Sequence, residues 1–138
     1  REGFGKRTFE ERERERRRKS TEAIVSAQRL AREKRQAEIN DLAHAFWIQQ
    51  VASAEEALAQ MTATERERFD QRFVQANPIW ARKYQEAGLN APLLRTAFYK
   101  FAVERLLDAG QKDIVAFARA RGVSLETINL LQTMTHSG

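Results

Sequence analysis

The chain has 138 residues, a formal net charge of +5 and no Cys. This length predicts one domain of ordinary size, and the absence of Cys excludes disulfides, Cys-based metal sites and thiol catalysis and favours an intracellular, cytoplasmic setting. No stretch approaches about 18 uninterrupted apolar residues, so we expect no membrane-spanning segment. The first residue is Arg1 rather than Met, and we therefore expect a fragment of a longer protein.

Charge divides the chain into two parts. Residues 1–40 hold 13 Lys and Arg against 8 Asp and Glu, a net charge of +5, whereas residues 41–138 hold 11 of each. This asymmetry predicts a basic helical arm over residues 1–38 and an electrically balanced body over residues 39–138.

The arm should begin as a loose lead-in over Arg1–Lys6, which contains two glycines. Thr8 is followed three residues later by Glu11, a capping-box pattern that predicts a helix start near Phe9. Every residue from Glu10 to Lys19 is charged. A helix here has no apolar face, so we expect it to be solvated and to fray or to become ordered on a partner.

A second helical pattern runs from about Ser20 to Gln60. Its first half carries only a thin stripe rich in Ala, formed by Ala23, Ile24, Ala27, Leu30 and Ala31. Its second half carries a full apolar seam, formed by Ile39, Leu42, Phe46, Trp47, Val51, Ala54, Leu58 and Met61. We expect the first half to project from the body or to pair with a second copy as a coiled coil.

Shorter helices should follow. Either Thr62 or Thr64 ends the long helix and caps the next one, which carries Phe69 and Phe73 on one face. Thr64 with Glu67 forms a second capping-box pattern. Asn77 should cap a third helix that starts at Pro78. That helix places Ile79, Trp80 and Tyr84 on an aromatic face.

Gly88 is placed to close this helix in a left-handed conformation. The next helix, from about Pro92 to Gly110, is apolar on a wide face that takes in Leu93 and Arg105, and we expect it to be the main partner of the seam over Ile39–Met61.

The last segment predicts two short helices joined at Gly122, with Ser124 capping the second. Because no alternating pattern of strands occurs, the fold class should be all-α: a helical bundle around one long N-terminal helix with a basic charged extension. The expected core is Leu42, Phe46, Val51, Leu58, Phe69, Phe73, Trp80, Leu94, Phe98, Phe101 and Phe117.

Few residues suggest catalysis or metal binding. Asp41 and His44 share a helical face, but further metal ligands are missing, and His136 lies near the end of the chain. The carboxylate groupings Glu55–Glu56 and Asp108 with Asp113 fit solvated helix positions better than an acid–base pair. We therefore expect no enzyme, no metal and no cofactor.

Aromatic side chains at helical spacing are core residues first, although they can also stack on nucleic-acid bases. Two stand beside cations, Trp80 next to Arg82 and Tyr99 next to Lys100. These two aromatic residues are the candidates for surface contacts.

The end of the chain resembles a helix-turn-helix motif. Phe117 and Ala118 precede Gly122, and Ile128 and Leu131 follow it. The second helix offers few groups for reading DNA and no Lys or Arg; its candidates are Ser124, Glu126, Asn129 and Thr133. We favour a plain helical hairpin and leave a DNA-reading motif as the alternative.

A further resemblance covers about residues 8–107. The Arg/Glu-rich stretch TFEERERERRRK, the amphipathic helix after it, the segment MTATERERF and a further apolar helix look like the tail that follows the winged-helix body in some plasmid replication initiator proteins. The winged helices have no counterpart here, so no binding residue is carried over. The resemblance implies a tail that touches DNA or a replication partner such as a helicase.

Two function classes remain. The favoured class is a non-catalytic helical module associated with nucleic acid, most simply DNA, through phosphate contacts from the arm. The cations expected to make these contacts are Arg12, Arg14, Arg16, Arg17, Arg18, Lys19, Arg29, Arg32, Lys34 and Arg35. The alternative is a protein-interaction module in which the long helix forms a homodimer or recruits a partner, without nucleic-acid contact and without membrane contact.

Overall fold

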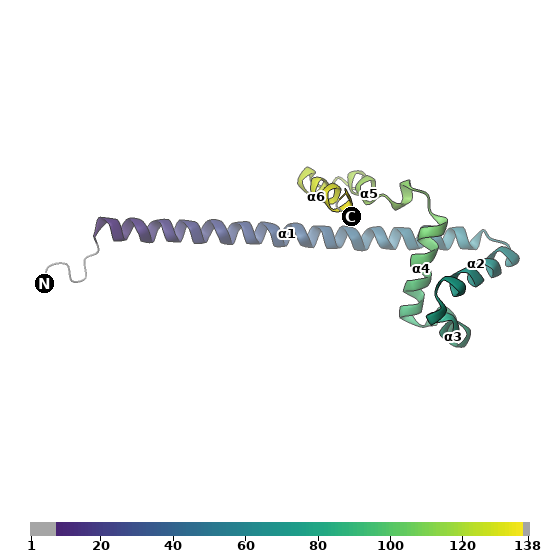
Figure 1. The fold of residues 1–138 in the computed structure, drawn as a ribbon. Coiled ribbons are helices and arrows are strands. Elements are labelled where there is room, and N and C mark those ends of the chain that lie inside the picture. The colour runs from purple at the N-terminus through teal and green to yellow at the C-terminus, as the bar shows by residue number, and fades with distance from the viewer. Residues whose placement is uncertain (1–7, 137–138) are drawn as a thin grey trace. The chain divides into compact units, whose positions relative to one another are not determined.

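In a computed structural model, residues 8–136 are described, and they form an all-α fold with no strand (Figure 1). The expected fold class is confirmed; the lead-in at Arg1–Lys6 lies outside the described residues. The α-helices are α1 (Phe9–Ala59), α2 (Ala63–Ala76), α3 (Pro78–Ala87), α4 (Pro92–Leu106), α5 (Ile114–Ala120) and α6 (Leu125–His136), with 3₁₀ turns η1 (Gly88–Asn90) and η2 (Gly110–Lys112).

Helix α1 is continuous and does not restart at Ser20. Its start matches the expected capping box: the Thr8 backbone N–H donates to Glu11 Oε2 at 3.3 Å, and the Glu11 N–H donates to Thr8 Oγ1 at 3.2 Å. Because no Gly or Pro lies between Phe9 and Ala59, nothing in the sequence forces a break.

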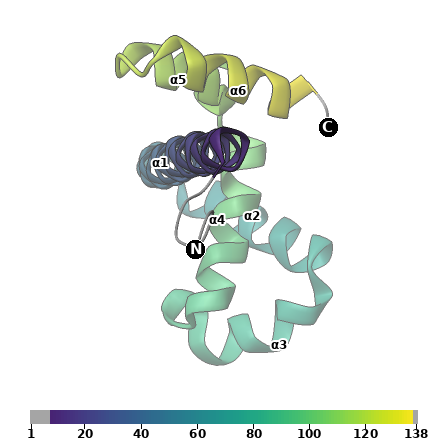
Figure 2. The same cartoon turned by 90° about the vertical axis from the view of Figure 1, so that its left-hand side faces the viewer.

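The chain divides into two compact units, residues 1–41 and residues 42–138. Helix α1 begins in the first unit and ends in the second. In the second unit, α5 and α6 lie side by side (Figures 1 and 2). Helices α2, α3 and α4 follow one another through short connections and form a separate layer of that unit.

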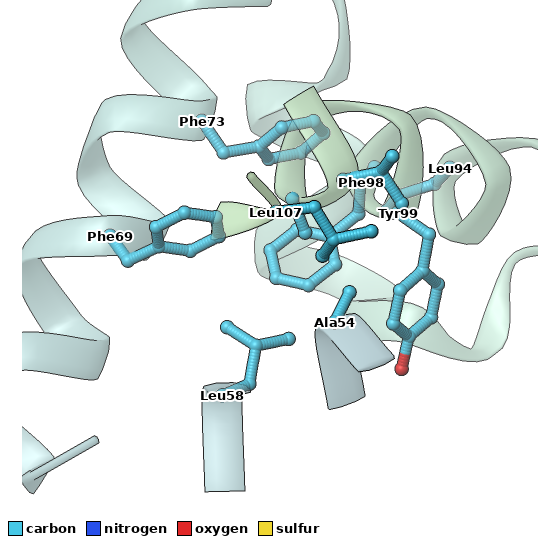
Figure 3. Packing of buried hydrophobic residues seen from close by; sticks show 10 residues of the cluster. Ala54, Leu58, Phe69, Phe73, Leu94, Phe98, Tyr99 and Leu107 are labelled. Atoms are coloured by element: carbon cyan, nitrogen blue, oxygen red, sulfur yellow. The ribbon is translucent and has the colours of Figure 1, made fainter. Parts of the chain in front are cut away.

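The main hydrophobic core of the second unit lies where α2 and α4 meet the last turns of α1. Figure 3 shows Ala54 and Leu58 of α1 directed toward aromatic side chains of α2 and α4. The buried members are Ala54, Leu58, Phe69, Phe73, Leu94, Phe98, Tyr99, Ala102, Val103 and Leu107. The expected seam and most of the expected core are thereby confirmed.

Aromatic rings fill the space between α2 and α4. Phe69 packs edge-on to Phe98 with 5.7 Å between ring centroids, and Phe73 packs edge-on to the same ring at 5.2 Å. Such edge-to-face pairs stabilise a core beyond their buried area by about 0.5–1.5 kcal/mol each. The rings of Trp80 and Phe101 are half-buried at the margin of this core.

Helix α4 packs against the C-terminal part of α1. Arg95 forms an ion pair with Glu55 at 3.6 Å, and the Arg95 guanidinium lies 5.4 Å from the centre of the Tyr99 ring. Burial, together with the nearby Glu55 carboxylate, raises the pKa of Tyr99. The expected apolar face is wrong at two positions, because Leu93 is 74% exposed and Arg105 is also exposed.

The structure decides between the two candidate caps of α2 and corrects the expected cap of α3. Thr62, not Thr64, caps α2: the Thr62 N–H donates to Glu65 Oε1 at 3.1 Å, and the Glu65 N–H donates to Thr62 Oγ1 at 3.1 Å. Asn77 precedes Pro78 as expected, but its side chain makes no cap for α3. Its Nδ2 donates instead to the carbonyl of Phe73 at 3.0 Å, which closes α2.

The C-terminal hairpin has the expected turn. Gly122 has φ +73°, a conformation that residues with a Cβ rarely adopt, and Ser124 Oγ accepts the Thr127 N–H at 3.3 Å to cap α6. Phe117 of α5 packs against Phe46 of α1 with 5.0 Å between ring centroids. This contact ties the hairpin to the part of α1 that belongs to the same unit.

Candidate nucleic-acid interface

The ten cations expected to contact phosphates all lie on α1, within the first unit. Nine are exposed, and Arg35 is half-buried. Residues 18 apart lie on the same side of an α-helix, since about 3.6 residues make one turn. Arg14 and Arg32 therefore share one side, while Arg17 and Arg35 share another.

Arg16 and Lys34 share a third side of the helix. Arg12 and Lys19 lie close to that side, because each is about one turn away from Arg16. The cations therefore surround the helix instead of forming one stripe. The sequence prediction did not address this arrangement, although it follows from residue spacing once the helix is known to be continuous.

Four of these cations form ion pairs along the helix. Their partners lie three or four residues away, and the N···O distances run from 3.6 to 3.9 Å: Arg16–Glu13, Arg18–Glu22, Lys19–Glu15 and Arg29–Glu33. Distances this long lie outside hydrogen-bonding range. Exposed pairs of this kind stabilise a helix by about 0.5 kcal/mol or less, so a phosphate can displace the carboxylate at low cost.

Five of the cations form no ion pair within residues 8–136: Arg12, Arg14, Arg17, Arg32 and Lys34. Their guanidinium and ammonium groups keep all their hydrogen-bond donors available to a partner. The Glu residues between them weaken the local field, but the run from Arg16 to Lys19 is not interrupted by an acid.

The arm also exposes apolar side chains. Ile24 is 58% exposed and Leu30 is 62% exposed. Val25, which was not assigned to the thin stripe, is 53% exposed. Ile24 and Leu30 are thus not buried, in contrast with Ile39, which is 7% exposed.

The hairpin after Gly122 keeps its candidate reading residues on the surface. Glu126, Asn129 and Thr133 of α6 are exposed, while Ile128 and Leu131 are buried. Thr133 Oγ1 donates to the carbonyl of Asn129 at 3.0 Å. The packing that the helix-turn-helix resemblance implies is present, but this packing is common to any helical hairpin.

The two aromatic surface candidates differ in burial. Tyr99 is 8% exposed and belongs to the core, so its assignment as a surface contact is wrong. Trp80 is half-buried and packs against the same core. Trp80 therefore stays a candidate for a surface contact, whereas Tyr99 does not.

Two of the carboxylates singled out in the sequence accept backbone hydrogen bonds. Asp113 Oδ1 accepts the backbone N–H groups of Val115 and Ala116 and so caps α5. Asp108 Oδ1 accepts the Gln111 N–H at 2.8 Å. Asp41 and His44 are both exposed, and the described residues hold no group of three or more His, Cys, Asp or Glu suited to a metal ion.

Comparisons with protein-family models, with curated proteins and with solved structures find no match for this chain. Across residues 8–136, no helix combines the length and the apolar character needed to cross a membrane.

Sequence reasoning missed a second cationic site, in the second unit. Arg68 and Arg72 of α2 and Arg105 of α4 line one pocket. The spacing of Arg68 and Arg72 by four residues places them on one face of α2. That spacing was visible in the sequence, but the contribution of Arg105 depends on how α4 packs against α2.

Proposed function

We propose that this chain is a non-catalytic helical module that binds nucleic acid, most simply double-stranded DNA, through phosphate contacts made by the arm, residues 1–38. The observation that carries this proposal is the set of exposed cations around the first part of α1, five of which have no acidic partner among the described residues. We further propose that the module belongs to a DNA-replication initiator or a similar DNA-binding protein, on the resemblance of residues 8–107.

The distribution of the cations around the helix suits a duplex groove. The major groove of B-DNA is about 12 Å wide and admits one α-helix, whose two sides then face the phosphates of both strands. Cations confined to one stripe would serve only one strand. In a groove, Arg14 with Arg32 and Arg16 with Lys34 can each approach phosphates from a different side of α1.

In this mode of binding, charge should supply most of the affinity, and the preference for particular DNA sequences should be weak. The arm offers many cations but no aromatic residue from Glu10 to Ala45. Affinity then comes from release of counterions from the phosphates.

The test compares three forms of the chain on a fluorescent random-sequence duplex by anisotropy. The first is the intact chain, and the second replaces Arg16, Arg17, Arg18 and Lys19 by Ala. The third, a control, removes the same charge from the second unit by replacing Arg82, Lys83, Lys100 and Arg119 by Ala. The proposal expects a large loss of affinity in the arm variant and a small loss in the control, and equal affinities in all three forms would contradict it.

A second function is favoured by one observation, the exposure of Ile24, Val25 and Leu30 on the arm. Apolar residues of this size on a long helix suit pairing with another helix. In that case the arm would form a homodimer or recruit a protein, with the cations as a solvated face. Sedimentation of the intact chain and of an Ile24→Gln/Leu30→Gln variant distinguishes the two functions. A dimer that the variant loses supports pairing of two copies, and a monomer at about 10–100 μM in both forms removes the homodimer.

A further inference from the structure

A pocket in the second unit lies between α2 and α4, next to the end of α1. Its volume is about 420 Å³, which falls within the range of ligand pockets in proteins. Its apolar lining is half-buried or buried: Met61, Phe69, Phe101 and Leu106. Its charged lining is exposed and consists of Glu65, Arg68, Arg72 and Arg105.

Within residues 8–136, the three arginines of the pocket are not held in ion pairs, although Arg68 is close enough to Glu65 to help lower the pKa of that carboxyl. Glu65, the acid that lines the pocket, is held by its capping-box hydrogen bonds with Thr62. By contrast, Arg66, which follows Glu65 on α2, forms an ion pair with Asp70 at 2.9 Å and lies over the Phe98 ring. The pocket therefore gathers three available guanidinium groups around an apolar floor.

The aromatic floor is already covered on one face. The guanidinium of Arg105 lies 4.9 Å from the centre of the Phe101 ring. Phe69 packs against Phe101 with 5.2 Å between their centroids. A nucleic-acid base needs an open ring face for stacking, so Phe101 is poorly placed to bind one. Aliphatic side chains, which have no such need, can contact Met61 and Leu106 instead.

We infer that this pocket docks an acidic, apolar peptide segment of a partner protein, with its carboxylates on Arg68, Arg72 and Arg105 and an apolar side chain against Met61 and Leu106. Carboxylates are the groups that guanidinium binds with two parallel hydrogen bonds. The apolar floor also favours a ligand with an apolar side chain, which a simple polyanion lacks. The site is separate from the arm on α1, so the inference does not depend on the proposed binding of nucleic acid.

The probe is a fluorescent 12-residue peptide in which Asp or Glu alternates with Leu. Three related probes separate the contributions: a peptide with each Leu replaced by Ser, a peptide with each acid replaced by its amide, and a single-stranded oligothymidine of similar charge. Each probe is titrated into the full chain and into two variants of equal net charge. The pocket variant is Arg68→Gln/Arg72→Gln/Arg105→Gln, and the control is Arg82→Gln/Lys83→Gln/Arg119→Gln.

The inference expects the acidic Leu peptide to bind the intact chain and the control alike, and to bind the pocket variant about tenfold or more weakly, because charge-assisted hydrogen bonds are lost. The Ser peptide and the amide peptide should both bind the intact chain more weakly. Since the arm is unchanged in both variants, its attraction for any polyanion cancels in the comparison.

The two methionines of the chain provide a direct readout of location. Met61 lines the pocket, whereas Met134 lies on α6 outside it. With the methyl groups labelled with ¹³C, the acidic Leu peptide should shift the Met61 signal and leave that of Met134 in place. Unchanged circular dichroism in the pocket variant shows that the variant is folded.

Several results would overturn the inference. One is equal binding of the peptide to the pocket variant and the control. Another is equal binding of the Ser and Leu peptides, which would mean that charge alone attracts them. A Met61 signal that moves with oligothymidine but not with the peptide would assign the pocket to nucleic acid. Absence of any binding up to about 1 mM would also reject it.

Discussion

Thr8 and Glu11 cap each other at the start of α1, through hydrogen bonds of 3.3 Å from the Thr8 N–H to the Glu11 carboxylate and 3.2 Å from the Glu11 N–H to the Thr8 hydroxyl. These bonds satisfy backbone donors that the first turn of a helix leaves without partners. The residues that follow have no apolar face, so packing cannot fix the start of α1 and this cap largely determines it.

Replacing Thr8 by Ala should therefore unwind the first turns of α1. Loss of such a cap costs about 0.5–2 kcal/mol locally, which an exposed helix end cannot recover from packing. Amide hydrogen exchange at Glu11 and Arg12 should become faster. Thr21→Ala is the control, because the Thr21 hydroxyl only donates to the carbonyl of Arg17 within the helix. Equal exchange in both variants would mean that the cap has no effect on the arm.

The core of the second unit predicts a sharp contrast between two phenylalanines. Phe98 has no exposed surface, while Phe9 is 73% exposed. Phe98→Ala should lower the free energy of unfolding by about 3–5 kcal/mol, since it removes a ring from a packed interior. Phe9→Ala should change it by less than about 0.5 kcal/mol. Urea denaturation measures both, and a loss below about 1 kcal/mol for Phe98→Ala would show that the core is misplaced.

Local sequence predicts the long apolar seam of α1 but not which residue caps each helix. The seam from Ile39 to Met61 was predictable because its spacing repeats without a Gly or Pro. The choice between Thr62 and Thr64 was not, because both stand three residues before a Glu and match the same capping pattern. Asn77 illustrates the same difficulty, since its amide can serve the helix before it or the helix after it.

Tertiary packing decided the remaining differences. Tyr99 and Lys100 are neighbours in sequence, yet Tyr99 is buried and Lys100 is exposed. The sequence suggested the wrong side because α4 is apolar around most of its circumference. Arg105 lies over Phe101, four residues earlier, and its role in the pocket with Arg68 depends on the distance between α2 and α4, which no local pattern encodes.

The cap of α2 should make the free energy of unfolding depend on pH, through the carboxyl group of Glu65. Hydrogen bonds from the backbone and side chain of Thr62 hold the pKa of Glu65 below its ordinary value. A carboxylate with a lowered pKa in the folded state stabilises the fold above its unfolded pKa, and this contribution is lost as the pH falls through the folded value. Intact protein should therefore be more stable than Glu65→Gln at pH near 7.

This difference should shrink at a strongly acidic pH, because the carboxyl of Glu65 becomes protonated as the pH falls through its lowered pKa. Urea midpoints measured at the two pH values provide the test, and Glu67→Gln, an exposed acid of the same helix, is the matched control. A gap between intact protein and Glu65→Gln that stays constant with pH would contradict the assigned cause.

The C-terminal hairpin should not contribute to DNA affinity if the arm makes the contacts. Asn129 and Thr133 are exposed on α6, and α6 carries no Lys or Arg. Replacing both by Ala should leave binding to a random duplex unchanged and create no change in preference between duplex sequences. A loss of sequence preference in this variant would move the assignment to the helix-turn-helix alternative, with Ser124 as the next residue to replace.

The most direct test of the phosphate-binding arm is the salt dependence of duplex binding, measured as the slope of log K against log salt concentration. Each phosphate contact on duplex DNA contributes about 0.9 to this slope. The variant with Ala at Arg16, Arg17, Arg18 and Lys19 should have a slope flatter by up to about four contacts' worth, with the second unit still folded. A slope that is the same for the intact chain and this variant would contradict the account.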